Sequence, residues 1–273
     1  MMTPKARGKP IDFKRTRSWL NRFDGYRVAV TEDRIQKWLK NFSAEDTDLA
    51  ARILDAVTFL KSEDMEEALR KMIARLPGWH RRKTRRRGKW RFVAFSISAG
   101  ESGDTMLHKS RTALGLNGSQ YNELFIHKAD LLKERLDAND SVAFFDDFAG
   151  TGQQACRAWG GLAELLPGNP TTYLILIAAG QRAVNRISNE TSLKVVANRV
   201  LGPSDDIFSQ DCCHFTESEK RHLLEYCRKA DFKNPQGYGN CGFAIVLAHK
   251  TPNNSIPALH ANHWRWMGLF PRH

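Results

Sequence analysis

The 273-residue sequence lacks long apolar runs and has few cysteines. No apolar stretch approaches the roughly 20 residues that a membrane-spanning helix needs, and the basic N-terminus has no apolar segment of the kind found in secretory signals. Five cysteines, an odd number, do not suggest a disulfide framework. These absences predict a soluble, cytoplasmic protein with reduced thiols and no membrane partner.

Several catalytic and metal-binding signatures are also missing. The Lys83-Thr84 pair has no Gly-rich Walker loop before it, and no Gly-x-Ser-x-Gly elbow occurs. Some residues are potential zinc ligands, but their spacing does not match the usual paired motifs. These residues are Cys212, Cys213, His214, His222 and Cys227. The sequence therefore predicts no protein-held metal site.

The positive charge of the chain is concentrated in two segments. Residues 1–27 carry +6 and Arg81–Arg91 carry +8 of a total of +12, so the remainder has a net charge of −2. Clustered Arg and Lys side chains beside Trp79 and Trp90 favour contact with a nucleic-acid backbone, with an indole available to stack on a base. The predicted contact residues are Arg81, Arg82, Lys83, Arg85, Arg86 and Arg87. The alternative is a disordered arm and a solvated loop that neutralises the protein's own phosphate ligand.

Apolar periodicity divides the chain into three predicted parts. Residues 1–27 are expected to form a basic flexible arm, and 28–78 a helical subdomain in which apolar residues recur at helical spacing. From Trp90 onward, apolar strand-like runs alternate with helical stretches. This alternation predicts an α/β domain over 79–273, with a mostly parallel sheet flanked by helices.

The segment Phe144–Gln154, FFDDFAGTGQQ, places two acids and a small-residue loop directly after an apolar run. If that run is a buried strand, Asp146 and Asp147 lie at its carboxyl end, where ligands bind in open α/β sheets. Gly150–Gly152 would then open a helix. Free backbone N–H groups and the helix dipole suit a phosphate at such a position. The segment therefore predicts a site for a phosphorylated sugar.

These residues resemble the phosphoribosyl pyrophosphate loop of type I phosphoribosyltransferases. The resemblance implies that Asp146 and Asp147 are the catalytic pair that holds the ribose hydroxyls. It also implies that the 5′-phosphate is bound by Gly150, Thr151, Gly152, Gln153 and Gln154. Thr151 keeps the loop hydroxyl, whereas Gly150 and Gln154 stand where those enzymes usually carry hydroxyl residues. Ribose-phosphate binding survives these departures more easily than full transferase chemistry does.

A second loop follows the predicted strand Trp90–Ser98. By position, Ala99–Gly103 resembles the pyrophosphate-binding loop of the transferase fold. The predicted pyrophosphate-binding residues are Ser102, Gly103, Lys109 and Arg111. The last two would offset negative charge on the leaving group, although cations at this spacing are equally expected as solvated helix residues. The implied cofactor is Mg²⁺ carried by the substrate, because Mg²⁺ prefers a few carboxylates together with substrate oxygens.

Near the C-terminus, Asn253, Asn254 and Trp264 form a possible pocket for a base or a partner. The asparagines are equally explained as turn residues that bond to neighbouring backbone, and Trp264 would equally close the core.

A closer resemblance covers the chain from about Trp38 to Arg272. It depends on WLKNFSAEDTDLAARILDAVTFL, ISAGESGDTMLHKSR, FFDDFAGTGQQ and the C-terminal stretch NPQGYGNCGFAIVLAHKTPNNSIPALHANHWRWMGLFPRH. These segments resemble the phosphoribosyltransferase-like effector domains of bacterial conflict systems. Some members of that group are encoded beside retron reverse transcriptases, together with a winged-helix protein.

The resemblance implies a toxin-like effector of anti-phage defence, with a reverse transcriptase, its reverse-transcribed DNA and a winged-helix protein as partners. The implied chemistry is ribosyl transfer or N-glycosidic hydrolysis at the anomeric carbon of a nucleotide, NAD or phosphoribosyl pyrophosphate. An alternative is a catalytically inactive subunit that senses nucleotides or binds nucleic acid. A housekeeping salvage transferase is disfavoured by the N-terminal helices and the Trp-rich C-terminus.

Overall fold

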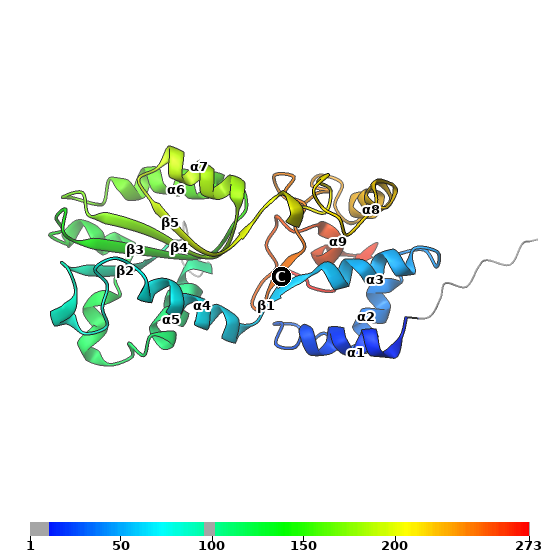
Figure 1. Ribbon diagram of the computed structural model, residues 1–273, viewed down its shortest axis with the longest axis horizontal. Coiled ribbons are helices and arrows are strands. Elements are labelled where there is room, and N and C mark those ends of the chain that lie inside the picture. The colour runs from blue at the N-terminus through cyan, green and yellow to red at the C-terminus, as the bar shows by residue number, and fades with distance from the viewer. Residues whose placement is uncertain (1–10, 96–101, 273) are drawn as a thin grey trace, which may run out of the picture. The chain divides into compact units, whose positions relative to one another are not determined.

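The computed structural model describes residues 11–95 and 102–272, and the chain forms two compact units. The terminal unit consists of residues 1–62 and 202–273, and the central unit of residues 63–201. Figure 1 labels the elements of both units. The division differs from the predicted boundaries at 27 and 78, because the chain returns to the terminal unit after residue 201.

The central unit contains a four-stranded parallel sheet in the order β2-β3-β4-β5. The strands are β2 (Trp90–Ala94), β3 (Ser141–Ala149), β4 (Thr171–Gly180) and β5 (Lys194–Leu201). Residues 142–145 of β3 and 174–179 of β4 are almost fully buried. Continuous apolar runs are typical of parallel strands covered on both faces. The predicted α/β class with a parallel sheet flanked by helices is therefore confirmed.

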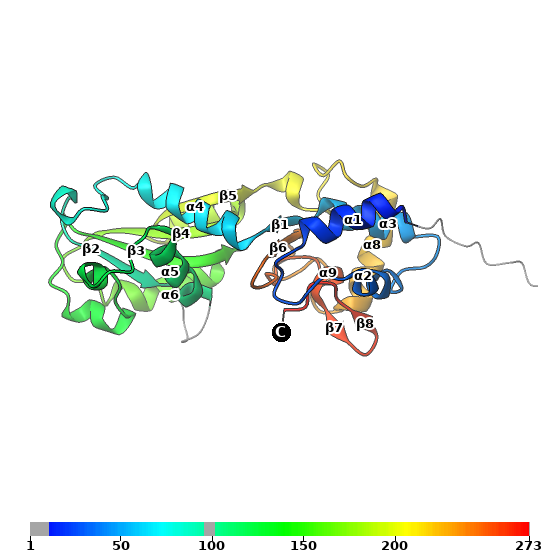
Figure 2. The same ribbon diagram turned by 90° about the horizontal axis from the view of Figure 1, so that it is seen from below.

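Helices cover both faces of this sheet. Figure 1 shows α6 (Gln153–Ala163) and α7 (Gln181–Glu190) on one side, and α4 (Ser62–Ala74) and α5 (Ser102–Ala113) on the other. Figure 2 gives the view from below, with strands β2 to β5 labelled across the unit. The side chains of Trp159 and Ile187, from α6 and α7, share an apolar cluster with Phe144 and Leu174. The described part of the unit also contains three short 3₁₀ helices: η1 (Lys83–Arg85), η2 (Ser119–Leu124) and η3 (Lys128–Lys133).

The terminal unit is mainly helical. Its helices are α1 (Phe13–Arg22), α2 (Glu32–Leu39), α3 (Thr47–Ala56), α8 (Glu217–Ala230) and the short η4 (Pro203–Asp205) and α9 (Pro257–His260). Strand β1 (Thr58–Leu60) pairs in parallel with β6 (Ile245–Leu247), and β7 (Asn262–His263) pairs antiparallel with β8 (Trp266–Met267). Across the described ranges 11–95 and 102–272, no helix has both the length and the apolar character needed to cross a membrane.

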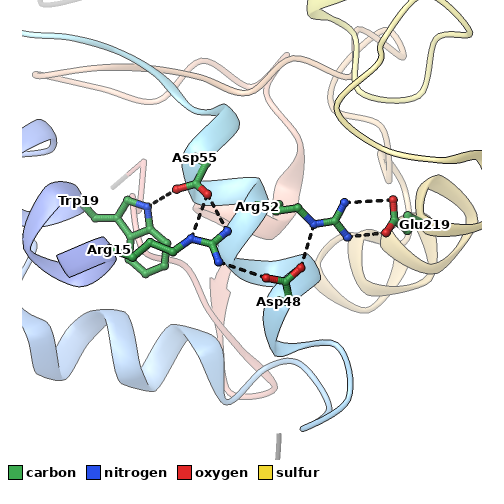
Figure 3. A network of polar contacts seen from close by, with 6 residues as sticks. All are labelled: Arg15, Trp19, Asp48, Arg52, Asp55 and Glu219. Atoms are coloured by element: carbon green, nitrogen blue, oxygen red, sulfur yellow. Dashed lines mark hydrogen bonds and ion pairs between the residues drawn. The ribbon is translucent and has the colours of Figure 1, made fainter. Parts of the chain in front are cut away.

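Residues 13–22, which the sequence analysis placed in a flexible arm, form α1. The Trp19 side chain is only 1% exposed, and its Nε1 donates a 2.7 Å hydrogen bond to Asp55. Arg15 pairs with both Asp48 and Asp55 of α3, as Figure 3 shows. Helix α1 is therefore rich in basic residues and still packs one of its faces in the core.

The helices within residues 28–62 share their core with the C-terminal part of the chain. Nε1 of Trp38 donates a 2.7 Å hydrogen bond to the carbonyl oxygen of Ala258. The Phe42 ring lies 4.6 Å from the ring of Tyr226 and 5.6 Å from that of Trp266, measured between centroids. Apolar periodicity indicates that a helix has a buried face, but it does not indicate which segment packs against that face. For this reason the sequence predicted a separate helical subdomain, whereas these helices pack against the C-terminal part of the chain.

A polar network also links α3 to α8. Arg52 lies between Asp48 of its own helix and Glu219 of α8, with which it forms a bidentate ion pair (Figure 3). Glu219 also accepts a 2.8 Å hydrogen bond from the backbone N–H of Thr216 in a capping box. The hydrogen bonds from Arg52, followed by that from Thr216, lower the pKa of Glu219 to about 2.

Candidate functional site

Both predicted acids lie in the last part of β3, which continues beyond them to Ala149. Asp146 is in register with Leu176 of β4, and Asp147 is 7% exposed. Although successive side chains of a strand start towards opposite faces, the two carboxyl groups are close enough to interact, and the charge and side chain of Asp147 both act on Asp146. β3 therefore supplies two interacting acids near its carboxyl end.

Asp146 receives two hydrogen bonds on one oxygen. The Ser102 hydroxyl donates to Oδ1 of Asp146 at 2.6 Å, and the backbone N–H of Asp147 donates to the same atom at 2.8 Å. Ser102 is the first residue of α5. Two segments that the sequence predicted to share a ligand, the acid pair and the start of α5, are thus in direct contact.

Gly103 allows this close approach of α5 to the sheet. A Cβ atom at this position would lie 2.9 Å from the carbonyl oxygen of Phe145 and 2.9 Å from the backbone nitrogen of Phe95. Any other residue would push α5 away from the ends of β2 and β3. Residues 99–101 of the predicted pyrophosphate loop lie outside the described residues.

The pKa of Asp146 is raised well above the ordinary value of an aspartic acid. Burial of the carboxyl group among protein atoms is the main cause, and repulsion by the charge of Asp147 is the second. The hydrogen bonds from Ser102 and from the Asp147 N–H act in the opposite direction. A cation or a hydroxyl donor bound beside the pair would stabilise its ionised form.

The predicted phosphate loop forms the connection from β3 to α6. Gly150 and Gly152 are buried and Thr151 is half-buried, whereas Gln153 and Gln154 are exposed at the start of α6. The Thr151 hydroxyl accepts a 3.4 Å hydrogen bond from the N–H of Gln153. Gly152 precedes the helix and has no side chain, so it offers no side-chain cap to the first turn.

Gly152 also brings α7 to the same edge of the sheet. Its φ of +75° is left-handed, and a Cβ would lie 3.0 Å from the carbonyl oxygen of Ala183. Helix α7 begins at Gln181, directly after β4. The positive dipole ends of α6 and α7 therefore lie at the carboxyl edge of the sheet, where they favour an anion.

The sequence pattern did not single out the start of α7 as part of the site. Nε2 of Gln181 donates to Oδ1 of Asn185 at 2.8 Å, one helical turn away. Ala183 and Ile187, apolar residues four positions apart that are fully buried, are the spacing that indicates this helix.

Two predicted pyrophosphate-binding residues are not at the start of α5. Arg111 donates to the carbonyl oxygen of Leu116 at 3.2 Å and to Oδ1 of Asn122 at 2.6 Å. Lys109 Nζ lies 3.5 Å from Oε1 of Glu66 on α4. At a rise of about 1.5 Å per residue, Arg111 is roughly 13 Å along the helix from Ser102. The structure brings Ser102 and Gly103 to the acids, but not Arg111.

Three of the six predicted nucleic-acid-binding side chains are held by contacts within the central unit. The contacts join Arg81 to the carbonyl oxygen of Gly115, Lys83 to Glu123, and Arg86 to the carbonyl oxygen of His80 and the ring of Trp79. Arg82, Arg85 and Arg87 are exposed. Trp90 is only 1% exposed, so it packs in the core and does not offer an indole for stacking.

A pocket of about 560 Å³ lies beside this basic loop, where α4 and α5 end. Its lining residues are Arg70, Ala74, Trp79, His80, Arg81 and residues 112–115. This lining includes a half-buried indole but neither of the β3 acids.

The possible C-terminal pocket belongs to the terminal unit. Asn254 is 5% exposed and donates to the carbonyl oxygen of Tyr238 at 2.8 Å, whereas Asn253 is exposed. Trp264 is 84% exposed, and Trp266 is the indole that closes the core at 2% exposure. Asn254 therefore serves the turn, as one of the two interpretations expected, whereas Trp264 faces solvent and does not close the core.

A parallel sheet with paired acids on a central strand and helix N-termini at its carboxyl edge defines the class of phosphoribosyltransferase-like proteins. The chain belongs to the PRTase-CE family, whose model matches residues 35–272. The match confirms the resemblance to phosphoribosyltransferase-like effector domains. A comparison with curated proteins gave no match.

Proposed function

We propose that the central unit binds a ribose-phosphate or pyrophosphate ligand at the carboxyl edge of β3. There it acts at the ribose anomeric carbon of a nucleotide, NAD or phosphoribosyl pyrophosphate. The observation that carries the proposal is the contact of Ser102 with Asp146, on the strand that leads through the small-residue loop into α6. Family membership over residues 35–272 supports the same chemistry.

Each part of the site has a proposed role. Asp146 and Asp147 accept hydrogen bonds from the ribose hydroxyls, and their charge favours the positive ring that develops as the leaving group departs. Backbone N–H groups at the start of α6 and the Thr151 hydroxyl orient the 5′-phosphate. Ser102 and Gly103 offer a hydroxyl and a closely placed backbone to the leaving group.

The carboxylates of Asp146 and Asp147 also suit Mg²⁺, which prefers a few acidic oxygens together with substrate phosphates. They are the residues that would hold a substrate-borne Mg²⁺. Such an ion would supply positive charge that offsets the charge of a leaving pyrophosphate.

The reaction replaces the bond from the anomeric carbon to its leaving group with a bond to an incoming nucleophile. Pyrophosphate, a base or nicotinamide leaves with the bonding electrons, and water or an amine supplies the new bond and releases a proton. In a cell, such an activity held in check until infection would make the chain a toxin-like effector of anti-phage defence. A retron reverse transcriptase with its DNA and a winged-helix protein are the proposed partners.

A second candidate function is a catalytically inactive subunit that senses a nucleotide or binds nucleic acid. Specific observations favour it. Arg111 is committed to Leu116 and Asn122, so it is not beside the acids to meet a leaving group. Gly150 and Gln154 replace hydroxyl residues of the transferase loop, and exposed arginines remain on the basic loop.

The deciding experiment compares D146N/D147N with the wild-type chain, each expressed with and without its neighbouring genes. Cellular nucleotides and NAD are measured after the system is triggered. The exposed Glu164, the C-cap residue of α6, provides the control variant E164Q. Loss of a nucleotide or NAD pool in the wild type and in E164Q, but not in D146N/D147N, supports the enzyme. Unchanged pools with intact toxicity support the binding subunit.

A further inference from the structure

The hairpin β7–β8 has an unusual turn. Strands Asn262–His263 and Trp266–Met267 are joined by only two residues, Trp264 and Arg265. Trp264 is 84% exposed, and the guanidinium carbon of Arg265 lies 3.9 Å from the centroid of its ring. The tip of the hairpin is therefore a solvent-facing indole already paired with a cation.

Neither residue is explained by the folding of the hairpin. Neither has the positive φ for which two-residue hairpin turns favour Asn, Asp and Gly, so the turn itself does not call for Trp or Arg. The core contact comes instead from Trp266, which donates a 3.2 Å hydrogen bond to the carbonyl oxygen of Ala258. An indole that is 84% exposed forfeits most of the stabilisation that burial of a large apolar side chain provides. A binding role accounts for a Trp-Arg pair at this turn.

The hairpin is held against the end of α8. Nδ1 of His263 accepts a 3.2 Å hydrogen bond from the N–H of Arg265, which leaves Nε2 as the donor to the carbonyl oxygen of Ala230 at 3.0 Å. Phe232, two residues after Ala230, is also 84% exposed. The hydrogen bond from His263 to Ala230 therefore joins the two chain segments that carry the exposed rings of Trp264 and Phe232.

The charge around these rings is mainly positive. Lys233 is exposed beside Phe232, and Lys229, whose Nζ lies 4.6 Å from the centroid of the Tyr226 ring, is exposed near the end of α8. The neighbouring acid, Asp231, accepts hydrogen bonds on Oδ1 from the backbone N–H groups of Lys233 at 2.9 Å and Asn234 at 3.2 Å. These donors offset the negative charge within the turn.

We propose that this aromatic-cationic surface, comprising Lys229, Phe232, Lys233, Trp264 and Arg265, binds single-stranded nucleic acid. Bases stack on the exposed rings, and the cations bind the phosphates, an arrangement that tolerates any base sequence. A nucleic acid is favoured as the occupant because the exposed charged side chains that flank the rings are cations, which suit a phosphate backbone. The inference depends on the terminal unit alone and is independent of the chemistry proposed for the central unit.

The test is performed in a full-length R82Q/R85Q/R87Q background, so that the basic loop does not obscure the surface. Fluorescence anisotropy with a labelled 12-nucleotide single strand of mixed sequence measures affinity. W264A and F232A are each expected to weaken binding about tenfold, within the range of one base-stacking contact. W264F keeps a ring and is expected to retain most of the affinity. L132A removes a 60% exposed apolar side chain of the central unit and serves as the matched control.

Thermal unfolding of each variant shows whether it remains folded, which is expected because the substituted side chains are exposed. Equal binding by W264A, F232A and the parent overturns the proposal. So does absence of any oligonucleotide binding in the parent background. Loss of a copurifying protein partner in W264A, with oligonucleotide affinity unchanged, would reassign the surface to protein recognition.

Discussion

The Ser102 hydroxyl donates a 2.6 Å hydrogen bond to Oδ1 of Asp146, joining the first turn of α5 to the central strand of the sheet. Residues 44 positions apart thereby form one polar centre. The bond lowers the pKa of Asp146, while burial and the charge of Asp147 raise it. The ionisation of Asp146 is thus coupled to the position of α5.

Substitution of Asp146 should change how stability depends on pH. Because the pKa of Asp146 is raised in the folded protein, the folded state binds more protons than the unfolded state above the ordinary aspartate value of about 3.9. The free energy of unfolding therefore falls as pH rises towards the raised pKa. D146N should flatten this fall, as measured by urea unfolding between pH 4 and pH 8. A slope equal to that of the wild type and of E164Q would contradict it.

Removal of the Ser102 hydroxyl should raise the pKa of Asp146 further. If ligand binding requires the carboxylate, S102A should weaken the binding of magnesium phosphoribosyl pyrophosphate about tenfold at pH 6, the scale of a hydrogen bond to a charged group. The loss should shrink at pH 8. Calorimetric titration across this range measures the effect, and S102T, which keeps a hydroxyl, should restore binding. An equal loss at both pH values would show that ionisation of Asp146 is not involved.

Two glycines near α6 offer opposite predictions. G152A places a Cβ on a left-handed backbone against Ala183. It should lower the free energy of unfolding by roughly 1–2 kcal/mol. G160A faces open space within the helix and should stabilise by about 0.5–1 kcal/mol. Chemical denaturation of both variants measures the difference. A neutral G152A would mean that the loop rearranges easily.

The ion pair of Arg52 and Glu219 should contribute to stability only above acidic pH. The folded pKa of Glu219 is about 2, below its ordinary value of 4.5, so the contribution is fully present above pH 4.5 and is lost as pH falls through 2. R52A should lower the free energy of unfolding by at most about 1 kcal/mol at pH 7, because the pair is partly exposed. K37A, which breaks the more exposed ion pair with Asp33, should lower the free energy of unfolding by only a few tenths of a kcal/mol. Equal losses in both variants would argue against a special role of the α3–α8 network.

The arginines of the basic loop should fall into two groups, those that hold the loop in place and those that bind nucleic-acid phosphates. R82Q/R85Q/R87Q should leave the thermal midpoint unchanged and reduce the salt dependence of single-strand binding by about 0.7 per lost phosphate contact. R86A should lower the thermal midpoint, because Arg86 holds the carbonyl oxygen of His80 and covers Trp79. An unchanged salt slope in the triple variant would remove the loop from nucleic-acid recognition.

Much of the central unit could be predicted from local pattern. The apolar runs of β3 and β4 are continuous, which is typical of buried parallel strands. The two acids and the small-residue loop directly follow one of these runs, so the candidate site could be placed on the chain before its geometry was known. The start of α5 could be predicted only as a second loop, because its contact with Asp146 spans 44 residues.

Other predictions depended on contacts that local pattern does not encode. The basic composition before residue 27 concealed the buried face of α1, where Trp19 packs. Trp264 and Trp266 are two residues apart, yet one is exposed and the other buried. Arg111 follows the predicted loop in sequence, but the length of α5 carries it away from the acids.

The sequence by itself determined the α/β class, the position of Asp146 and Asp147 on a buried strand, and the family to which the chain belongs. These features depend on residues close together in the chain, whose spacing follows the period of a strand or a helix. The tertiary structure alone decided which segments share a core, which arginines of the basic loop are held by other residues, and which indole faces solvent. Those outcomes depend on packing between residues far apart in sequence, where burial and hydrogen-bond partners are decided by the whole fold.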